Sequence, residues 1–325
     1  MRYAITGGSG FIGSHLTEFL ISESNHEVVI YDNNYSGDQR NLSNVIHHGR
    51  LDIIQGDVLN KNHLSDSISD ADRIYHLAAI AGVGNVISKQ IETLRTNIDG
   101  TRNVLNIAAK NDIPLFIAST SDVYGKSGSV PFTEQSDRLM GPTTIPRWAY
   151  ASAKVIDEYF ALAYLKKYKL PVVIGRFFNV SGARQSNAPG TVIPTFVDRA
   201  LSDKPIIIHG DGSQIRSFTH VNDAVRAIYE LMLKPQDNVG IYNIGSENKI
   251  SIINLANLVV EQSNSNSSYQ FQSHDSVYGT NFEDSEEKVP DISKLKRTIG
   301  YEPSYSTAEI VQDVLDFARK SEHYG

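Results

Sequence analysis

The chain has 325 residues, a formal charge of −7 at neutral pH and no cysteine. Without cysteine there can be no disulfide, no thiol nucleophile and no cysteine-ligated zinc, and we expect no metal site. The negative charge argues against a nucleic-acid-binding protein, which would carry a basic patch or stripe. No signal peptide is evident at the N-terminus, and no apolar run approaches the roughly 20 residues needed to cross a bilayer. We therefore expect a globular cytoplasmic protein without a membrane partner.

The first half of the chain alternates short β-branched runs with helical stretches. The expected strands are residues 2–6, 27–32, 51–57, 72–79, 114–120 and 171–177. Between them, apolar residues recur at spacings of three and four, most clearly over residues 91–109, and a long helical stretch covers residues 148–168. Strands that alternate with helices form a parallel sheet covered on both faces. The sequence thus predicts an α/β fold built on a doubly wound parallel sheet of the Rossmann type.

The first strand runs directly into a glycine-rich segment, TGGSGFIG (residues 6–13), which opens the first helix. Gly7, Gly10 and Gly13 are spaced as in a dinucleotide-binding loop: the first permits a tight turn, the second lets the backbone approach a pyrophosphate, and the third lets helix pack on strand. The N–H groups at the helix start would bind the phosphates. Asp32 ends the second strand, where a carboxylate holds a ribose 2′-hydroxyl and disfavours a 2′-phosphate. The predicted cofactor is therefore NAD rather than NADP.

Two further strand ends extend the predicted cofactor site. Asp57 and Val58 follow the third strand and would lie beside the adenine. The fourth strand ends in Leu77, Ala78 and Ala79, which would line the path of the cofactor.

The segment YASAK places Tyr150 and Lys154 four residues apart, on one face of the long predicted helix. A tyrosine phenol has an unperturbed pKa of about 10, so it is a poor base at neutral pH. A nearby ammonium group and the positive ring of an oxidised nicotinamide would both favour the phenolate. Lowering the pKa to about 7 requires roughly 4 kcal/mol of differential stabilisation, which two close positive charges in a dry cleft can supply.

The second half of the chain is less regular. A polar stretch at residues 263–276 is predicted to be a surface loop that leads into a short strand. We predict a cofactor-binding domain over residues 1–177, to which segments near 215–230 and 240–245 return. Residues 178–325 would mainly form a smaller α/β lobe that binds the substrate.

Eight segments, in order, resemble the extended short-chain dehydrogenase/reductases, in particular their nucleotide-sugar epimerase/dehydratase family. The segments are TGGSGFIG, HLAA, TNIDGTRNVL, STSDVYG, YASAK, RFFNVSG, HGDGSQIRSFTHVND and PDISKLKRTIGYEP. Because they span nearly the whole chain, the series is highly specific. The resemblance implies tightly held NAD, a nucleoside-diphosphate sugar substrate and transient oxidation, usually at C4 of the sugar.

The resemblance also implies roles for particular residues. Tyr150, next to Lys154, would take the hydroxyl proton while Thr120 hydrogen-bonds the same oxygen, and these three would be the catalytic residues. The implied cofactor contacts are Gly7, Gly10, Phe11, Ile12, Gly13, Asp32, Asn33, Asp57, Val58, Leu77, Ala78, Ala79, Tyr150 and Lys154. The implied substrate contacts are Ser121, Asp122, Asn179, Arg184, Ile208, His209, Arg216 and Lys288.

Within the substrate set, Asn179 and Arg216 match contacts to the diphosphate, and Ile208 and His209 lie where the base packs. The family often has arginine where this chain has Lys288, which keeps the charge and loses the bidentate geometry. Arg184 and Arg147 are candidate anchors for a negatively charged sugar such as a uronate. Phe218 takes the place of an aromatic residue that covers the nucleotide.

The reactions of this family differ mainly around Asp122. The 4,6-dehydratases have a T-D-E loop whose two acids eliminate water, and here Ser121 replaces the first acid. The decarboxylases have a T-S-E loop and the RWxY segment found at residues 147–150, with Asp122 in place of their glutamate. The 4-epimerases need no acid beyond the Tyr–Thr pair, and the loop at residues 32–42 resembles theirs.

The preferred prediction is therefore an NAD-dependent 4-epimerase acting on a UDP-hexose or UDP-uronate. The alternative is a UDP-glucuronate decarboxylase-type enzyme, and a 4,6-dehydratase is favoured less. A homodimer is also expected, because helices near residues 89–110 and 148–168 pair across subunits in similar proteins.

Overall fold

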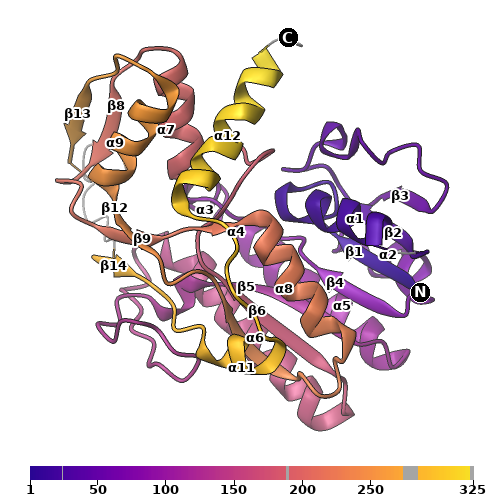
Figure 1. The fold of residues 1–325 in the computed structure, drawn as a ribbon. Helices are drawn as coiled ribbons and strands as arrows, with labels where there is room; N and C mark the ends of the chain where they lie inside the picture. Colours follow the sequence, from indigo (N-terminus) through magenta and orange to yellow (C-terminus); the bar gives the residue numbers. More distant parts are fainter. Residues whose placement is uncertain (24, 188–189, 274–284, 323–325) are drawn as a thin grey trace.

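The structure is a computed structural model that describes residues 1–23, 25–187, 190–273 and 285–322. Its centre is a parallel sheet of seven strands in the order β11-β6-β5-β4-β1-β2-β3 (Figure 1). The strands are β1 (Arg2–Thr6), β2 (Glu27–Asp32), β3 (Leu51–Gln55), β4 (Arg73–His76), β5 (Leu115–Thr120), β6 (Val172–Phe177) and β11 (Gly240–Ile244). Strand order runs outward from β1 in both directions, so it reverses between β1 and β4. The predicted doubly wound α/β fold is confirmed, and this reversal is where such sheets bind ligands.

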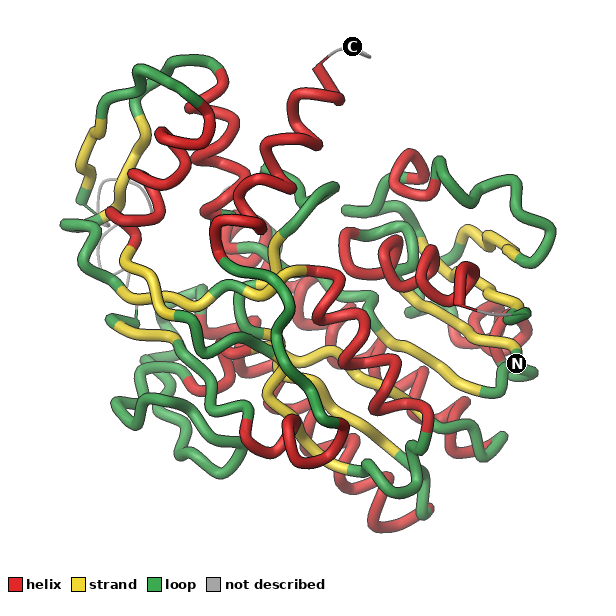
Figure 2. The backbone as a smooth tube through the Cα atoms, in the orientation of Figure 1, coloured by secondary structure: helices red, strands yellow, loops and turns green. Residues whose placement is uncertain are grey.

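Helices cover both faces of the sheet (Figure 2). One face carries α1 (Phe11–Glu23), α8 (Val221–Leu233) and α11 (Ser293–Ile299), and the other carries α2 (Lys61–Ile68), α5 (Gly100–Lys110) and α6 (Trp148–Tyr168). Successive side chains of a strand point to opposite faces. In β1, for example, Tyr3 and Ile5 belong to the first core and Ala4 to the second. Burial on both faces explains why the strands read as continuous apolar runs.

The helix expected over residues 91–109 is interrupted. The structure divides it into α4 (Gln90–Leu94), a π-helical turn η2 (Arg95–Asp99) and α5. The buried Asn97 side chain donates to the Ile80 carbonyl at 3.0 Å and accepts from the Ile80 N–H at 2.9 Å. π turns inside helices occur frequently at functional sites, and this one brings Thr96 to the cavity described below.

The second half of the chain adds a smaller layered unit beside the sheet (Figure 1). Its elements are α7 (Val192–Leu201), β8 (Ile206–His209), α9 (Ile252–Ser263), β13 (Tyr269–Gln272) and α12 (Thr307–Glu322), and its apolar side chains form a separate core. Short strand pairings join this unit to the sheet: β7 (Val180–Ser181) with β10 (Thr219–His220), and β9 (Ile215–Ser217) with β12 (Lys249–Ser251) and β14 (Glu287–Lys288). β11 returns to the central sheet beside β6. The division into domains at residue 177 stays a proposal.

The remaining short elements are η1 (Gln39–Leu42), α3 (Val83–Ser88) and η3 (Ser121–Tyr124). The stretch predicted as a loop leading to a strand contains β13, and its residues 274–276 lie outside the described residues. Within the ranges that the structure describes, no helix is both long and apolar enough to span a membrane.

Candidate active site

A cavity of about 460 Å³ lies along the carboxyl ends of the parallel strands. Its walls come from the ends of β1, β2, β4, β5 and β6 and from the start of α1. Ligands of open α/β sheets bind outside the carboxyl ends of the strands, at the reversal of strand order. The cavity therefore occupies the position at which the fold presents its functional groups.

The glycine-rich loop forms one end of this cavity. Gly7 has a φ of +76°, and a Cβ atom there would lie 2.7 Å from the backbone nitrogen of Ala78. A Cβ atom on Gly13 would lie 2.2 Å from the Gly7 carbonyl oxygen. Both positions thus require glycine, the first for the turn and the second for close packing of α1 on the loop.

Asp32 is held rigidly beside the loop. Its carboxylate accepts hydrogen bonds from the backbone N–H groups of Ser9, at 2.9 Å, and Asn34, at 2.8 Å. The side chain lines the cavity, in the position of a ribose-binding carboxylate. A loop that approaches phosphates through backbone and a fixed acid at the next strand end fit a dinucleotide without a 2′-phosphate.

Most of the predicted cofactor residues line this cavity. They are Gly7, Gly10, Phe11, Ile12, Gly13, Asp32, Asn33, Val58, Leu77, Ala78, Ala79, Tyr150 and Lys154. Asp57 lies behind them: its carboxylate accepts from the Asn33 amide at 3.1 Å and from the Leu59 N–H at 2.8 Å. Asp57 therefore bears on the site through Asn33.

Thr120 and Tyr150 meet at the centre of the cavity. Thr120 ends β5, and its hydroxyl accepts from the Asp122 N–H at 3.2 Å, which caps the short helix η3. Burial raises the pKa of Tyr150 above its usual value, and the negative charges of Asp122 and Asp157 raise it further, while the hydrogen bond with Thr120 lowers it. The pair has the contact expected of a proton acceptor and its partner.

The sequence analysis expects the positive charge of Lys154 to favour the Tyr150 phenolate, but in the structure this charge is paired with another residue. Its ammonium nitrogen lies 3.3 Å from a carboxylate oxygen of Asp157, and both side chains are almost fully buried. The two residues are three positions apart on α6, so they share a helix face. The positive charge predicted to lower the pKa of the phenol is thus largely compensated by Asp157, a residue that the sequence analysis did not single out.

Asp122 forms an ion pair with Lys288 beside the same centre. Lys288 reaches it from β14, which pairs in parallel with β9 so that Lys288 lies opposite Arg216. Partial burial raises the pKa of Asp122, but the charges of Lys288, Arg147 and Arg216 outweigh this and hold it below its usual value. The Asp122 side chain is 35% exposed and lines the cavity, so it is an ionised group within reach of a ligand.

Among the remaining residues predicted to contact the substrate, Ser121 and Asn179 line the cavity. Asn179 has its amide bound to the Ser217 carbonyl at 2.8 Å. Arg216 is nearly buried and donates to the Ile215 carbonyl at 2.9 Å, beside the ion pair described above.

Three residues expected to contact the substrate have other surroundings in the structure, and their roles toward a ligand stay predictions. The Arg184 guanidinium binds both carboxylate oxygens of Glu18, at 2.7 and 2.8 Å, so it joins α1 to the loop after β7 and does not support a role in holding a sugar. The Ile208 side chain is fully buried in the core of the smaller unit, as is nearly all of Phe218, because α7 and α9 cover them. Neither side chain is therefore free to pack against a nucleotide. His209, at the end of β8, remains partly exposed.

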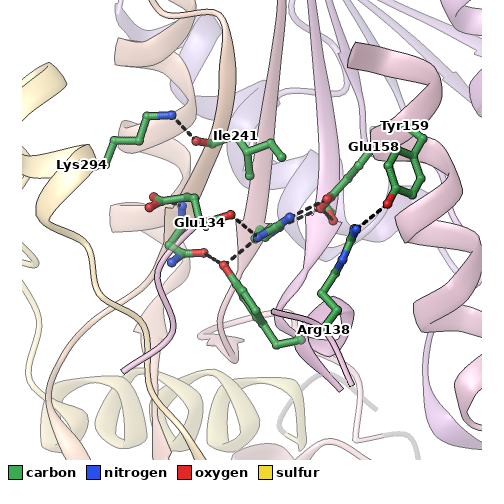
Figure 3. A network of polar contacts seen from close by, with 10 residues as sticks. Glu134, Arg138, Glu158, Tyr159, Ile241 and Lys294 are labelled. Carbon is green, nitrogen blue, oxygen red and sulfur yellow. Dashed lines mark hydrogen bonds and ion pairs between the residues drawn. The ribbon is translucent and has the colours of Figure 1, made fainter. Parts of the chain in front are cut away.

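A buried polar network that sequence reasoning missed joins β6, α6 and β11 to Tyr124 of η3 (Figure 3). Arg176 of β6 forms a two-pronged ion pair with Glu158 of α6, at 2.7 and 2.9 Å, and donates to the Tyr124 hydroxyl at 2.8 Å. Tyr124 donates to Asn243 of β11 at 2.6 Å, and Ser119 donates to Glu158 at 2.6 Å. The network thus holds Ser119, which precedes Thr120, and Tyr124, which follows Asp122 by two residues. Ser119, Tyr124 and Arg176 lie in the segments STSDVYG and RFFNVSG, and Glu158 lies four residues after Lys154 on the same face of the helix, but no local pattern shows that they meet.

Comparison with known proteins shows which family the chain belongs to. The model of the family described as GDP-mannose 4,6 dehydratase matches residues 4–314, nearly the entire chain. The chain belongs to this family. The resemblance to nucleotide-sugar epimerases and dehydratases of the extended short-chain dehydrogenase/reductases is thereby confirmed.

Curated relatives of the chain include decarboxylases of UDP-linked uronic acids. The chain is 39% identical to the UDP-N-acetyl-alpha-D-glucosaminuronate decarboxylase of Bacillus cytotoxicus, over 99% of both chains. It is 34% identical to UDP-glucuronic acid decarboxylase 1 of Xenopus tropicalis, over 98% of this chain and 72% of the relative. Among solved structures, the UDP-glucuronic acid 4-epimerase of Bacillus cereus, in complex with UDP-glucuronic acid and NAD, has a TM-score of 0.88 at 28% identity and covers 99% of this chain and 100% of its own.

Proposed function

We propose that the protein decarboxylates a UDP-linked uronic acid, with NAD as its resident cofactor. The protein is a family member that acts on nucleotide sugars with NAD, and the choice among reactions rests on the Asp122–Lys288 ion pair. A carboxylate and an ammonium group beside the reacting sugar are groups that an epimerase does not need. The 39% sequence identity to the Bacillus cytotoxicus decarboxylase, over 99% of both chains, supports the same choice. Decarboxylation thus replaces 4-epimerisation as the preferred function.

The first part of the reaction belongs to the centre of the cavity. NAD, when bound, provides the hydride acceptor and donor for C4 of the sugar. Tyr150 takes the proton of the C4 hydroxyl and Thr120 orients that oxygen, so the sugar carries a ketone at C4. The carboxylate on C5 is then β to this ketone. The bond between C5 and the carboxylate carbon breaks, carbon dioxide leaves, and the electron pair passes to the C4 oxygen as an enolate.

The second part needs a proton at C5. The Lys288 side chain is held by the ionised Asp122, so we assign this pair the task of delivering that proton and of regaining one from solvent. Arg147 and Arg216 add positive charge around Asp122. Cations surrounding one carboxylate in the cavity suit a substrate that brings a second carboxylate. Return of the hydride to C4 completes the cycle, and no net oxidation occurs.

A UDP-uronate 4-epimerase is the second candidate. It would use only Thr120, Tyr150 and Lys154, which are all present, and the Bacillus cereus epimerase has the same overall fold. In that case Asp122 and Lys288 would only shape the pocket.

One assay separates the candidates. The protein is incubated with UDP-glucuronate, with its N-acetylglucosaminuronate counterpart and with UDP-glucose, and the products are examined by mass spectrometry and proton NMR. Loss of the mass of carbon dioxide from a uronate supports decarboxylation. An unchanged mass with an inverted C4 coupling supports epimerisation and overturns the proposal.

A further inference from the structure

The Lys154–Asp157 ion pair is almost completely buried. Both side chains are at most 2% exposed, and the nitrogen–oxygen distance is 3.3 Å. Burying two charges is costly and gives little net stability even when they are paired. Within the described ranges, neither Asp157 oxygen has a hydrogen-bond partner of good geometry. The carboxylate is therefore satisfied chiefly by the charge of Lys154.

The groups around Asp157 leave Lys154 as its main source of stabilisation. On the neighbouring α5, the Thr101 hydroxyl lowers the pKa of the Asp157 carboxyl through a looser contact. Behind it, His76 Nε2 lies 3.0 Å from Thr101, and burial and Lys154 lower the pKa of His76 to about 3, so the imidazole is neutral. On α6 itself, Glu158 is already bound by Arg176.

The charge of Asp157 also bears on the phenol. Its carboxylate and that of Asp122, on η3, both raise the pKa of Tyr150. Asp122 has Lys288 as its counter-ion, whereas Asp157 is balanced by the lysine that should support the phenolate. The surface pair of Arg102 and Asp99 on the same side is exposed and therefore screened.

We propose that Asp157 is a positioning residue that holds the Lys154 ammonium and limits the positive charge that Lys154 presents to Tyr150. The inference rests on the role of Tyr150 as proton acceptor in the proposed function, and it holds equally for decarboxylation and epimerisation. Removing the negative charge should raise the fraction of Tyr150 that is ionised at neutral pH, because the phenolate would then face an ammonium that is no longer neutralised.

The test follows the ionisation of Tyr150 directly. NAD-saturated protein is prepared with isotope-labelled tyrosine, and the Tyr150 resonance is assigned by its loss in Tyr150→Phe. In Asp157→Asn the midpoint of the Tyr150 titration should fall by about one pH unit or more, a tenfold change in the ionisation constant. Asp157→Glu, which retains the charge, should stay near the wild type. An unchanged or higher midpoint in Asp157→Asn would overturn the proposal.

Two controls isolate the effect. Asp99→Asn removes an exposed carboxylate from the adjoining turn and should leave the midpoint unchanged, and a matching fall there would also count against the proposal. If Asp157→Asn does not fold, Asp157→Ser carries the same titration, because it removes the charge and leaves a small polar group. NAD affinity should stay close to that of the wild type, whereas a collapse of affinity without a change in midpoint would mean that Asp157 has only a structural role.

The outcome is separable from that of the proposed function. The titration needs no substrate, so a lowered midpoint stands even if none of the three nucleotide sugars is converted. Conversely, decarboxylation by an Asp157→Asn variant with an unchanged midpoint would retain the function and refute this inference.

Discussion

At the scale of single residues, Asp122 is the group that distinguishes decarboxylation from epimerisation in the proposed function. It is ionised, partly exposed to the cavity and paired with a cation from a different part of the chain. In the proposed mechanism Tyr150 and Thr120, by contrast, act in the removal of a proton and a hydride from the sugar, a step that decarboxylation and epimerisation share. Substitutions at these two kinds of residue should therefore fail at different steps.

Asp122→Asn should reduce decarboxylation by about 100-fold or more, because the amide cannot balance Lys288 or share its proton. Reduction of bound NAD by the uronate, followed by its absorbance, should be affected far less. Asp137→Asn, an exposed carboxylate in the segment that follows η3, should behave as the wild type. Full carbon dioxide release by Asp122→Asn would show that the ion pair has no part in the chemistry.

Tyr150→Phe should lower turnover by roughly 1,000-fold while NAD remains bound, because the phenol is the proton acceptor and one oxygen atom is all that is lost. Both NAD reduction and product formation should fall together, in contrast to Asp122→Asn. Single-turnover absorbance measurements with UDP-glucuronate check this, and an unchanged rate would exclude the proposed oxidation.

At the scale of secondary-structure elements, the buried pair of Arg176 and Glu158 ties β6 to α6 behind the catalytic loop. Glu158→Gln should lower the free energy of unfolding by about 3–5 kcal/mol, because it leaves a buried guanidinium without its counter-ion. The double variant with Arg176→Met should recover part of this loss. Urea unfolding monitored by circular dichroism measures both, and equal losses in the single and double variants would contradict the idea.

The pH dependence of stability provides a second test on α6. Burial raises the pKa of Asp157 from near 4 to about 6, in spite of the charge of Lys154. The folded state then binds more protons than the unfolded state between these values, so this residue makes the protein less stable as pH rises from about 4 to 6. The free energy of unfolding of the wild type minus that of Asp157→Asn should therefore decrease across this window, as measured by urea titration at fixed NAD concentration. A constant or increasing difference would be the wrong sign.

The elements themselves were largely predictable, and their tertiary partners were not. The boundaries of β1, β2 and α6 were predicted correctly because apolar periodicity and turn residues are local properties of the sequence. The π turn at η2 was missed because it accompanies the contact of the Asn97 amide with residue 80, which no local pattern records. The glycine loop and YASAK were recognisable as motifs for the same local reason. The compensation of Lys154, the anchoring of Arg184 by Glu18 and the burial of Ile208 all depend on how elements pack.

At the scale of the whole molecule, helices α4 and α6 carry large apolar side chains that are exposed. Ile91 of α4 is 71% exposed and Tyr159 of α6 is 59% exposed, with Ile156 and Leu162 between one-third and two-fifths exposed nearby. Large exposed apolar patches usually mark interfaces. We therefore predict a homodimer in which α4 and α6 pack against their counterparts in a second copy.

Ile91→Glu combined with Leu162→Glu should convert this dimer to a monomer of 36.0 kDa without loss of fold. Sedimentation at micromolar concentration measures the mass, and circular dichroism checks the fold. Leu233→Glu provides a matched control, because Leu233 is similarly exposed but lies at the end of α8 on the other face of the sheet. A wild-type mass of one chain, or dissociation by the control alone, would refute the assignment of the face.

The short strand β14 separates the tasks of the molecule in a way that bears on how such enzymes diversify. The groups proposed to remove and return a hydrogen lie on strand β5 and helix α6, whereas Lys288 belongs to the two-residue strand β14, which pairs with β9. Under the proposed function, a change at Lys288 would alter the fate of the oxidised sugar without touching Thr120 or Tyr150, which oxidise it. A scaffold organised in this manner can acquire a new product while it retains the whole of its redox machinery.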